Sequence, residues 1–286
     1  MKVLVLGKDG QVGRALARVF PEAIFLGRKD LDLSLPETIE FTLQELQPSC
    51  IINAAAYTAV DQAESEAELA FLVNETAVAE LARYAAENNV WLIHFSTDYV
   101  FPGEQKHPYR EDNATGPTGV YGRSKLAGEQ AILKHCTRYY IFRTSWVFAE
   151  ECANFVSTML RLAGERDQLG VVNDQIGCPT YAGDIADIVS QVVNQKPIES
   201  GIYHLSCSGP VTWHDFAIEI FQRASTAGFI SRIPKVKALT TAEYPTDAQR
   251  PANSVLDTDK LQQALGITMP HWSIGLQKML DKHSGR

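Results

Sequence analysis

Apolar and polar positions alternate in blocks along the first half of the chain. Short apolar runs predict buried strands at residues 3–6, 23–26, 50–54, 90–96 and 139–144. Segments of helical periodicity between them predict helices at residues 14–20, 36–46, 64–88 and 121–135. Ser34 is the expected cap of the second helix, whose first turn tolerates Pro36. This alternation predicts an α/β fold with a doubly wound, Rossmann-like parallel sheet.

The pattern is less regular after about residue 150. Helical periodicity returns at residues 154–165 and 213–227, and prolines interrupt much of the rest. We therefore expect a dinucleotide-binding domain over residues 1–150. A smaller C-terminal substrate-binding region over residues 151–286 is expected to pack on the carboxyl edge of the sheet, with the chain crossing between the two more than once.

Composition narrows the classes of function. The net charge of −8, from 26 basic and 34 acidic residues, argues against a general binder of nucleic acid or membrane surfaces. The apolar start is too short for a signal peptide or a span, and no other apolar run reaches spanning length. Five scattered cysteines without a CxxC pair are typical of reduced thiols, which favours a cytoplasmic location. The seven histidines show no paired spacing, so no metal site is expected.

A glycine loop follows the first predicted strand. Gly7, Gly10 and Gly13 frame Gln11 and Val12 just before a helix. Such a loop lets the backbone approach a pyrophosphate, and the helix start offers free N–H groups to it. The spacing is GxxGxxG rather than the usual GxGxxG, and an ordinary turn is the alternative. Its place at the head of an alternating chain favours dinucleotide binding.

Ribose recognition is expected near the end of the second strand. Arg28 and Lys29 precede Asp32 and Leu33 there. A basic residue at this point accepts the 2′-phosphate of NADPH, whereas an acidic residue favours NADH. The basic residues predict NADPH, with NADH possible; a solvated basic turn is the competing interpretation.

Three side chains predict acid/base chemistry beside the cofactor. Tyr121 and Lys125 are spaced to share one face of a helix. A phenol is a poor proton donor at neutral pH unless a nearby cation stabilises its anion. Thr97 ends the fourth predicted strand, where it can donate a hydrogen bond to a carbonyl oxygen. A strand-end cap is the alternative for Thr97, and chance is the alternative for the Tyr–Lys spacing.

Two further strand ends are ambiguous. Ala54 and Ala55 follow the third strand, where small residues admit a cofactor backbone or simply allow tight packing. Trp146 follows the fifth strand, where its ring can stack on a sugar or nicotinamide face or fill core.

The motifs together resemble a known family. The glycine loop, the segment from Ser96 to Phe101 and the YGRSK segment at Tyr121 are similar to those of extended short-chain dehydrogenase/reductases. Further segments resemble the dTDP-4-dehydrorhamnose reductases within that family: residues 53–61, 142–147, 173–180, 212–215 and 250–254. The likeness covers nearly the whole chain and includes the expected substrate region.

The resemblance implies an activity and a set of roles. The family reduces the 4-keto group of dTDP-6-deoxy-L-lyxo-4-hexulose to dTDP-L-rhamnose, a precursor of lipopolysaccharide or cell-wall polysaccharide. The partner implied is a dTDP-sugar, and the protein is expected to act as a monomer or homodimer. Implied catalytic residues are Thr97, Tyr121 and Lys125. Implied cofactor contacts are Gly7, Gly10, Gln11, Val12, Gly13, Asp32, Leu33, Ala54 and Ala55, and implied substrate contacts are Thr58, Asp61, Asn74, Trp146 and Arg250.

The chain departs from the family at the positions of a metal site. Some members bind magnesium through glutamates at a dimer interface. The matching positions here are Ala15 and Gly183, which cannot ligate a metal. A metal-bridged dimer is therefore not expected.

Two other functions remain open from the sequence. A 4,6-dehydratase or epimerase can share this scaffold, but related dehydratases carry Asp-Glu after the threonine, and this chain has Asp98 and Tyr99. A catalytically silent regulatory subunit is the second alternative, as in methionine adenosyltransferase assemblies. The intact Thr97, Tyr121 and Lys125 weigh against it.

Overall fold

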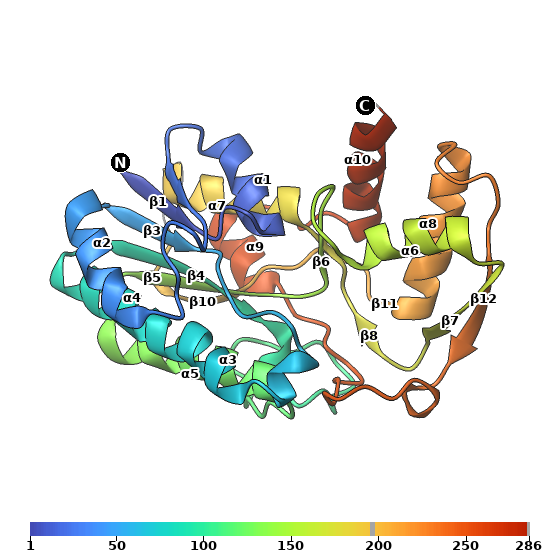
Figure 1. The fold of residues 1–286 in the computed structure, drawn as a ribbon, viewed down its shortest axis with the longest axis horizontal. Coiled ribbons are helices and arrows are strands. Elements are labelled where there is room, and N and C mark those ends of the chain that lie inside the picture. The colour runs from blue at the N-terminus through green and yellow to red at the C-terminus, as the bar shows by residue number, and fades with distance from the viewer. Residues whose placement is uncertain (195–197, 285–286) are drawn as a thin grey trace.

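The computed structural model describes residues 1–194 and 198–284. Its centre is a six-stranded parallel sheet in the order β10-β5-β4-β3-β1-β2 (Figure 1). Winding reverses between β1 and β3, which makes the sheet doubly wound and places a ligand crevice at their carboxyl ends. The strands are β1 (Val3–Leu6), β2 (Ile24–Leu26), β3 (Cys50–Asn53), β4 (Trp91–Thr97), β5 (Tyr139–Thr144) and β10 (Gly201–His204). The predicted α/β fold is confirmed.

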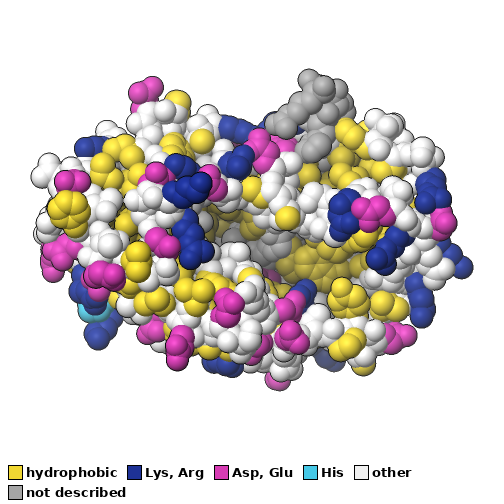
Figure 2. Space-filling model, viewed as in Figure 1, with side chains coloured by type: hydrophobic (Ala, Val, Ile, Leu, Met, Phe, Trp, Pro, Cys, Tyr) yellow, Lys and Arg dark blue, Asp and Glu magenta, His cyan; other side chains and the backbone are white. Residues whose placement is uncertain are grey.

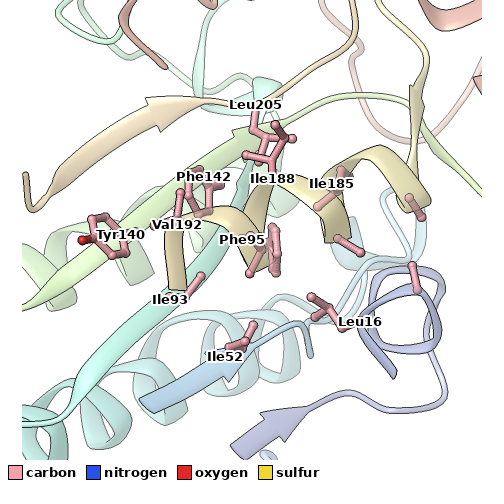
Figure 3. Close-up of a cluster of buried hydrophobic side chains, with 14 of the residues drawn as sticks. Leu16, Ile52, Ile93, Phe95, Tyr140, Phe142, Ile185, Ile188, Val192 and Leu205 are labelled. Atoms are coloured by element: carbon pink, nitrogen blue, oxygen red, sulfur yellow. The ribbon is translucent and has the colours of Figure 1, made fainter. Parts of the chain in front are cut away.

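Helices cover both faces of this sheet (Figure 1). One face packs against α1 (Gln11–Val19), α7 (Ala182–Asn194) and α9 (Asp259–Leu265). Figure 3 shows its core, where Leu16 and Ile185 meet Ile52, Ile93 and Phe142 of the strands. The other face packs against α2 (Ile39–Leu46), α4 (Ala77–Glu87) and α5 (Val120–His135). Strands buried on both faces explain the continuous apolar runs in the sequence.

The remaining elements gather beside the carboxyl edge of the sheet (Figure 1). Three helices, α6 (Phe155–Glu165), α8 (Trp213–Thr226) and α10 (Trp272–Ser284), form a second apolar core. Short strands pair around it: β6 (Val147–Phe148) with β9 (Thr180–Tyr181), β8 (Ile176–Gly177) with β11 (Val211–Thr212), and β7 (Gln168–Val172) with β12 (Lys235–Leu239). One turn, η5 (Thr241–Glu243), follows β12.

The expected long helix over residues 64–88 is wrong in detail. The structure has a 3-10 turn η2 (Gln62–Glu64), then α3 (Ala67–Phe71), a π-helical turn η3 (Leu72–Thr76) and α4. The π turn places the backbone oxygen of Asn74 so near α5 that a Cβ on Gly128 would lie 2.1 Å from it. Close helix packing therefore accompanies the irregular turn, which alanine-rich periodicity could not reveal.

One smaller expectation also fails, and two elements were missed. Ser34 does not cap the second helix, because its hydroxyl donates to Asp32 Oδ1 at 2.7 Å. That segment begins instead as a 3-10 turn, η1 (Pro36–Thr38), with Leu35 before it and no side-chain cap. Helix α7 and strand β10 were not predicted, although Ile185, Ile188, Val189 and Val192 repeat with helical spacing.

Candidate active site

A large cavity lies at the carboxyl edge of the sheet. Its volume is about 1160 Å³, and Figure 2 shows the surface hollowed between the sheet and the part that contains α6 and α8. Most of the predicted site residues line it: Gly7, Gly10, Gln11, Val12, Arg28, Asp32, Leu33, Ala54, Ala55, Thr58, Asp61, Thr97, Tyr121, Lys125, Trp146 and Arg250. Gly13 and Asn74 are not among the lining residues.

The glycine loop forms one wall of the cavity. Gly7 has φ +88°, and a Cβ there would lie 2.7 Å from the Ala54 carbonyl carbon. A Cβ on Gly13 would lie 2.1 Å from the Gly7 oxygen, so Gly13 lets α1 pack on the loop rather than facing a ligand. Gly10 precedes α1 without a side-chain cap, which leaves the first N–H groups of the helix available to an anion. The loop therefore fits a pyrophosphate.

Basic and acidic side chains alternate at the outer end of this wall. Arg28 Nε donates to Asp32 Oδ2 at 3.1 Å, and the Arg28 side chain is 75% exposed. Lys8 Nζ bonds Asp30 Oδ2 at 2.5 Å. These residues, with Lys29, surround a smaller hollow of about 710 Å³. A guanidinium that is exposed and held by one carboxylate can exchange that partner for a phosphate.

Thr97 ends β4 and begins the 3-10 turn η4 (Asp98–Val100). Its Oγ1 accepts from the Tyr99 N–H at 3.2 Å and donates to Asp98 Oδ1 at 2.9 Å. Asp98 is buried, and this burial raises its pKa to about 7. Thr97 therefore caps a turn and also lines the cavity.

Tyr121 and Lys125 lie one turn apart on α5 and both line the cavity. Burial raises the pKa of Tyr121 to about 12, against a smaller lowering by its hydrogen bond with Thr97. Burial lowers the pKa of Lys125 to about 8. In this structure the lysine does not lower the pKa of the phenol. The Lys125 Nζ instead lies 2.7 Å from the Phe95 oxygen, to which it donates, and 3.1 Å from His94 Nε2.

The opposite wall of the cavity is built from residues far apart in the chain. Arg250 Nη2 bonds Asp61 Oδ2 at 2.8 Å. Trp146, with φ +47°, stacks on Trp213 at a centroid distance of 3.4 Å and an interplanar angle of 7°. Phe155 packs at an angle on Trp213 at 4.6 Å. This wall thus pairs a charged contact with an aromatic stack.

Asn74 takes a different place from the one expected. It is 1% exposed, and its Oδ1 accepts from the Tyr57 N–H at 2.9 Å. Its amide nitrogen donates to the Tyr57 oxygen and to Ser124 Oγ, both at 3.0 Å. The side chain therefore fastens the loop after β3 to α5, and a direct substrate contact by Asn74 does not fit these bonds.

Sequence reasoning did not assign site roles to Trp213, Tyr99 and His94. Trp213 begins α8, and its position in the aromatic stack depends on contacts that no local pattern encodes. Tyr99 packs edge-on against the Tyr121 ring at 5.8 Å. His94 lies beneath Lys125 and precedes Thr97 in the same apolar run, which was the available signal.

Neither position that matches the family's metal ligands carries a side chain that could bind a metal ion. Ala15 of α1 is buried in the core that α1 shares with α7, and a Cβ on Gly183 would meet the Tyr181 ring at 2.3 Å. Across the described part of the chain, no group of three or more His, Cys, Asp or Glu side chains is placed to hold a metal ion.

Within the described residues, no helix is both long and apolar enough to cross a membrane.

Comparison with known proteins identifies the family. The model described as RmlD substrate binding domain matches residues 1–284. The dTDP-4-dehydrorhamnose reductase of Shigella flexneri is 45% identical over 292 residues, which cover 99% of this chain and 98% of the relative. The chain belongs to the dTDP-4-dehydrorhamnose reductase family.

Solved structures of this family have the same fold. The family member from Clostridium acetobutylicum is 36% identical with a TM-score of 0.92, covering 99% of both chains. The member from Bacillus anthracis, in complex with NADP, is 34% identical with a TM-score of 0.92, covering 99% of this chain and 100% of that one. The resemblance inferred from the motifs is therefore confirmed.

Proposed function

We propose that this chain uses NADPH to reduce the 4-keto group of dTDP-6-deoxy-L-lyxo-4-hexulose to dTDP-L-rhamnose, with Tyr121 as the proton donor. The observation that carries this proposal is the meeting of Thr97, Tyr121 and Lys125 with the glycine loop in one cavity. The relatives' common name, at 45% identity over nearly the full chain, supports the substrate. NADH is a possible second reductant.

The cofactor is proposed to lie along the glycine-loop wall. Gly7, Gly10, Gln11 and Val12 would hold the pyrophosphate through backbone groups. Arg28 would release Asp32 and bind the 2′-phosphate of NADPH instead. Asp32 and Leu33 would border the adenosine. Ala54 and Ala55 would lie against the cofactor backbone. The Bacillus anthracis relative binds NADP in its crystal structure, which supports the preference for NADPH.

The chemistry divides between the cofactor and three side chains. When bound, NADPH supplies a hydride to C4 of the sugar. Tyr121 gives its proton to the alkoxide that develops on the C4 oxygen. Thr97 would turn its O–H from Asp98 Oδ1 to that oxygen and donate a second hydrogen bond. Lys125, as an ammonium, stabilises the tyrosinate that remains.

The burial of Tyr121 sets the energy that these groups must supply. A shift of one pKa unit corresponds to about 1.4 kcal/mol. Bringing the phenol from about 12 to near neutrality would need about 7 kcal/mol of differential stabilisation. One cation in a site shielded from water can contribute several kcal/mol of this amount. The protonation state of Lys125 is therefore decisive for the proposed reaction.

The substrate is proposed to lie along the wall of Thr58, Asp61, Trp146 and Arg250. The Arg250 guanidinium is a suitable partner for a diphosphate oxygen, and the aromatic stack offers a flat apolar face. Trp213 is added to this group. Asn74 is proposed to act indirectly, by fixing Tyr57 and Ser124.

The residue after Asp98 weighs against dehydration. A dehydratase needs a carboxylate at that position, and this chain has Tyr99 there, whose pKa is raised by burial. A neutral phenol of that kind is a poor base for removing a proton from carbon.

We place the reduction in the cytoplasm, since all five cysteines are free thiols. The active form is proposed to be a monomer or homodimer.

The test is an assay of NADPH oxidation with dTDP-4-keto-6-deoxy sugars of both C5 configurations. Consumption of NADPH with the L-lyxo ketosugar, giving dTDP-L-rhamnose, is the expected result. Turnover with the other configuration alone would move the assignment to another sugar reductase. No turnover with either sugar, despite NADPH binding, would favour a catalytically silent subunit.

A further inference from the structure

His94 is a buried polar side chain that the proposed mechanism does not use. It is 0% exposed, lies on β4 and pairs in register with Asn53 of β3. Ile51 and Leu92, two residues earlier on the same strands, belong to the apolar core under α4 and α5. An imidazole in such a place is costly unless both ring nitrogens have partners. They do: Asn53 Nδ2 lies 3.1 Å from Nδ1, and Lys125 Nζ lies 3.1 Å from Nε2.

The orientation of the Asn53 amide fixes the proton on this imidazole. Asn53 Oδ1 accepts from the Ala55 N–H at 3.1 Å, so the NH₂ group faces His94. Because an amide NH₂ can only donate, His94 Nδ1 must accept and carries no proton. Burial holds the pKa of His94 well below its usual value, so the ring is neutral. Its single proton is therefore on Nε2, the nitrogen that faces Lys125.

The two protonation states of Lys125 fit this arrangement unequally. An ammonium has three donors and no acceptor, so it would oppose the N–H of His94 with another N–H. An amine can accept from His94 Nε2, donate to the Phe95 oxygen at 2.7 Å and keep one N–H for the cavity. The amine form satisfies every group of the network.

We propose that Asn53 and His94 are positioning residues that set the protonation state of Lys125. The Asn53 amide holds the His94 proton on Nε2, and this N–H favours the amine form of Lys125 over the ammonium. The role in catalysis rests on the proposed function, where Lys125 assists Tyr121. The placement of the proton itself does not depend on it.

The ammonium form requires the opposite arrangement. His94 would present its lone pair at Nε2 and carry its proton on Nδ1. Asn53 would then have to turn its oxygen to His94, which would set its NH₂ against the Ala55 N–H. Gain of a proton by Lys125 is thus linked to a tautomer change and an amide flip beside Ala55, which lines the cavity.

The charged and titratable groups around Lys125 do not supply the same bias. Glu129, one turn further along α5, raises the pKa of Lys125 but is itself held by Arg143 of β5 through bonds of 2.9 and 2.6 Å. Asn53 on β3 and Asn74 on η3 are buried and uncharged. Other titratable groups on neighbouring elements include Tyr121 on α5, Asp98 and Tyr99 on η4, Glu75 on η3, and Glu64 on η2, which accepts from the Val120 N–H.

This bias sets where the proposed reduction fails on the alkaline side. The proposed reduction uses Lys125 as an ammonium, so loss of its proton removes the stabilisation of the tyrosinate. Burial lowers the pKa of Lys125 to about 8. The His94 N–H, by favouring the amine, acts in the same direction as burial, so activity should decline from mildly alkaline pH upward.

The first experiment reads the tautomer directly, by ¹⁵N–¹H correlation of the imidazole nitrogens in the full-length protein without cofactor. The His94 signals are assigned by their loss in His94→Phe. The expected result is a protonated Nε2 and an unprotonated Nδ1. A proton on Nδ1 in the wild-type protein would overturn the proposal, whether or not any variant folds and whether or not the protein is a reductase.

The second experiment moves the proton. In Asn53→Asp, one carboxylate oxygen accepts from Ala55 and the other from a proton on His94 Nδ1. The His94 proton should move to Nδ1, and the pKa of Lys125, followed by its ¹³Cε shift, should rise by about one unit or more. Asn74→Asp adds a similar buried charge against α5 without touching the imidazole, and there the proton should stay on Nε2.

The activity measurement completes the test. Reduction needs the ammonium, so the alkaline limb of kcat/KM should move upward in Asn53→Asp by the same interval as the Lys125 pKa. A tautomer that moves while the Lys125 pKa and the pH profile both stay unchanged would overturn the positioning role. Failure of the ketosugar assay in every variant would count against the proposed function alone, since the tautomer and the lysine pKa are read without substrate.

Discussion

The two walls of the cavity are assembled in different ways. On the cofactor wall, Gly7 and Ala54 follow strands β1 and β3, and Thr97 ends the neighbouring strand β4, so backbone geometry does much of the positioning. On the substrate wall, Asp61 and Arg250 pair across 189 residues of chain. The cofactor wall is therefore a property of the sheet, whereas the substrate wall depends on how distant segments are held together.

This contrast suggests that the cofactor wall carries the chemical step and the substrate wall determines which substrate binds. Side chains at the ends of parallel strands are held by a hydrogen-bonded ladder, so Thr97 keeps its geometry when outer loops vary. A contact such as the stack of Trp146 on Trp213 is altered by substitution of either residue. Damage to the first wall should remove turnover, and damage to the second should change which substrate is bound and how tightly.

The largest expected effect is at Tyr121. Tyr121→Phe removes the proposed proton donor and leaves the ring packed against Tyr99. We expect kcat to fall by about 10²-fold or more, with NADPH binding retained. Steady-state kinetics and a fluorescence titration of NADPH measure the two quantities. Near-normal turnover in this variant would exclude Tyr121 as the acid.

The contact between the two parts of the molecule should be sensitive to acid. Burial would raise the pKa of Glu150, but hydrogen bonds from Lys282 and Tyr181 and the charge of Arg18 lower it to about 2. A carboxyl with a lowered pKa stabilises the fold above its usual pKa of 4.5 and loses that contribution as pH falls toward 2. Glu150→Gln should lower the free energy of unfolding at pH 7 by about 3 kcal/mol.

Urea denaturation at several pH values measures this effect. The difference in unfolding free energy between wild type and Glu150→Gln should shrink as pH falls below 4.5. A difference that stays constant over that range would show that the carboxylate charge is not what holds the two parts together.

Gly7 tests the cofactor wall. Gly7→Ala places a Cβ 2.7 Å from the Ala54 carbonyl carbon at φ +88°. Such strain costs about 1–3 kcal/mol, so NADPH binding should weaken about tenfold. Gly164→Ala, in α6 with nothing within 4 Å, is the matched control and should leave NADPH binding unchanged while stabilising the helix slightly. Equal effects from the two variants would contradict the strain argument.

Arg250 tests the substrate wall. Arg250→Ala removes a guanidinium that is tied to Asp61, and KM for the sugar nucleotide should rise about tenfold with kcat little changed. Arg232→Ala breaks an exposed pair with Asp167 outside the cavity and should leave KM as in the wild type. A fall in kcat at unchanged KM would place Arg250 in the chemical step instead.

The smallest effect is expected at Arg28. Its side chain is 75% exposed, and its interaction with a phosphate is weakened by solvent and salt. Arg28→Ala should weaken NADPH binding about fivefold and leave NADH binding unchanged. A parallel loss for both cofactors would show that Arg28 does not distinguish them.

The same contrast explains how much could be predicted from the sequence. The first five strands and the glycine loop carry local signals, namely apolar runs and small residues at their ends, and the structure has them nearly where expected. The π turn at η3 was not predictable from periodicity, because it depends on how Asn74 meets Tyr57 and α5. The Trp146–Trp213 stack joins elements whose separation in the chain hides their contact.

The electrostatic environment of Tyr121 and Lys125 also could not be predicted from the sequence. The spacing of Tyr121 and Lys125 indicated acid/base chemistry but could not reveal which groups hold the lysine. The bonds to Phe95 and His94 arise from a strand that passes beneath α5. Burial, which raises the pKa of Tyr121 and lowers that of Lys125, is likewise a property of the folded chain.

The late return of the chain to the sheet has a consequence for synthesis on the ribosome. β10, which covers the outer edge of β5, is made only after residues 145–200, and α9 follows later still. Until then the emerging chain displays an unpaired strand edge with Tyr140 and Phe142 still without Tyr203. A fragment that stops near residue 150 would keep that edge permanently, so shortened forms of this protein should aggregate rather than fold as a free cofactor module.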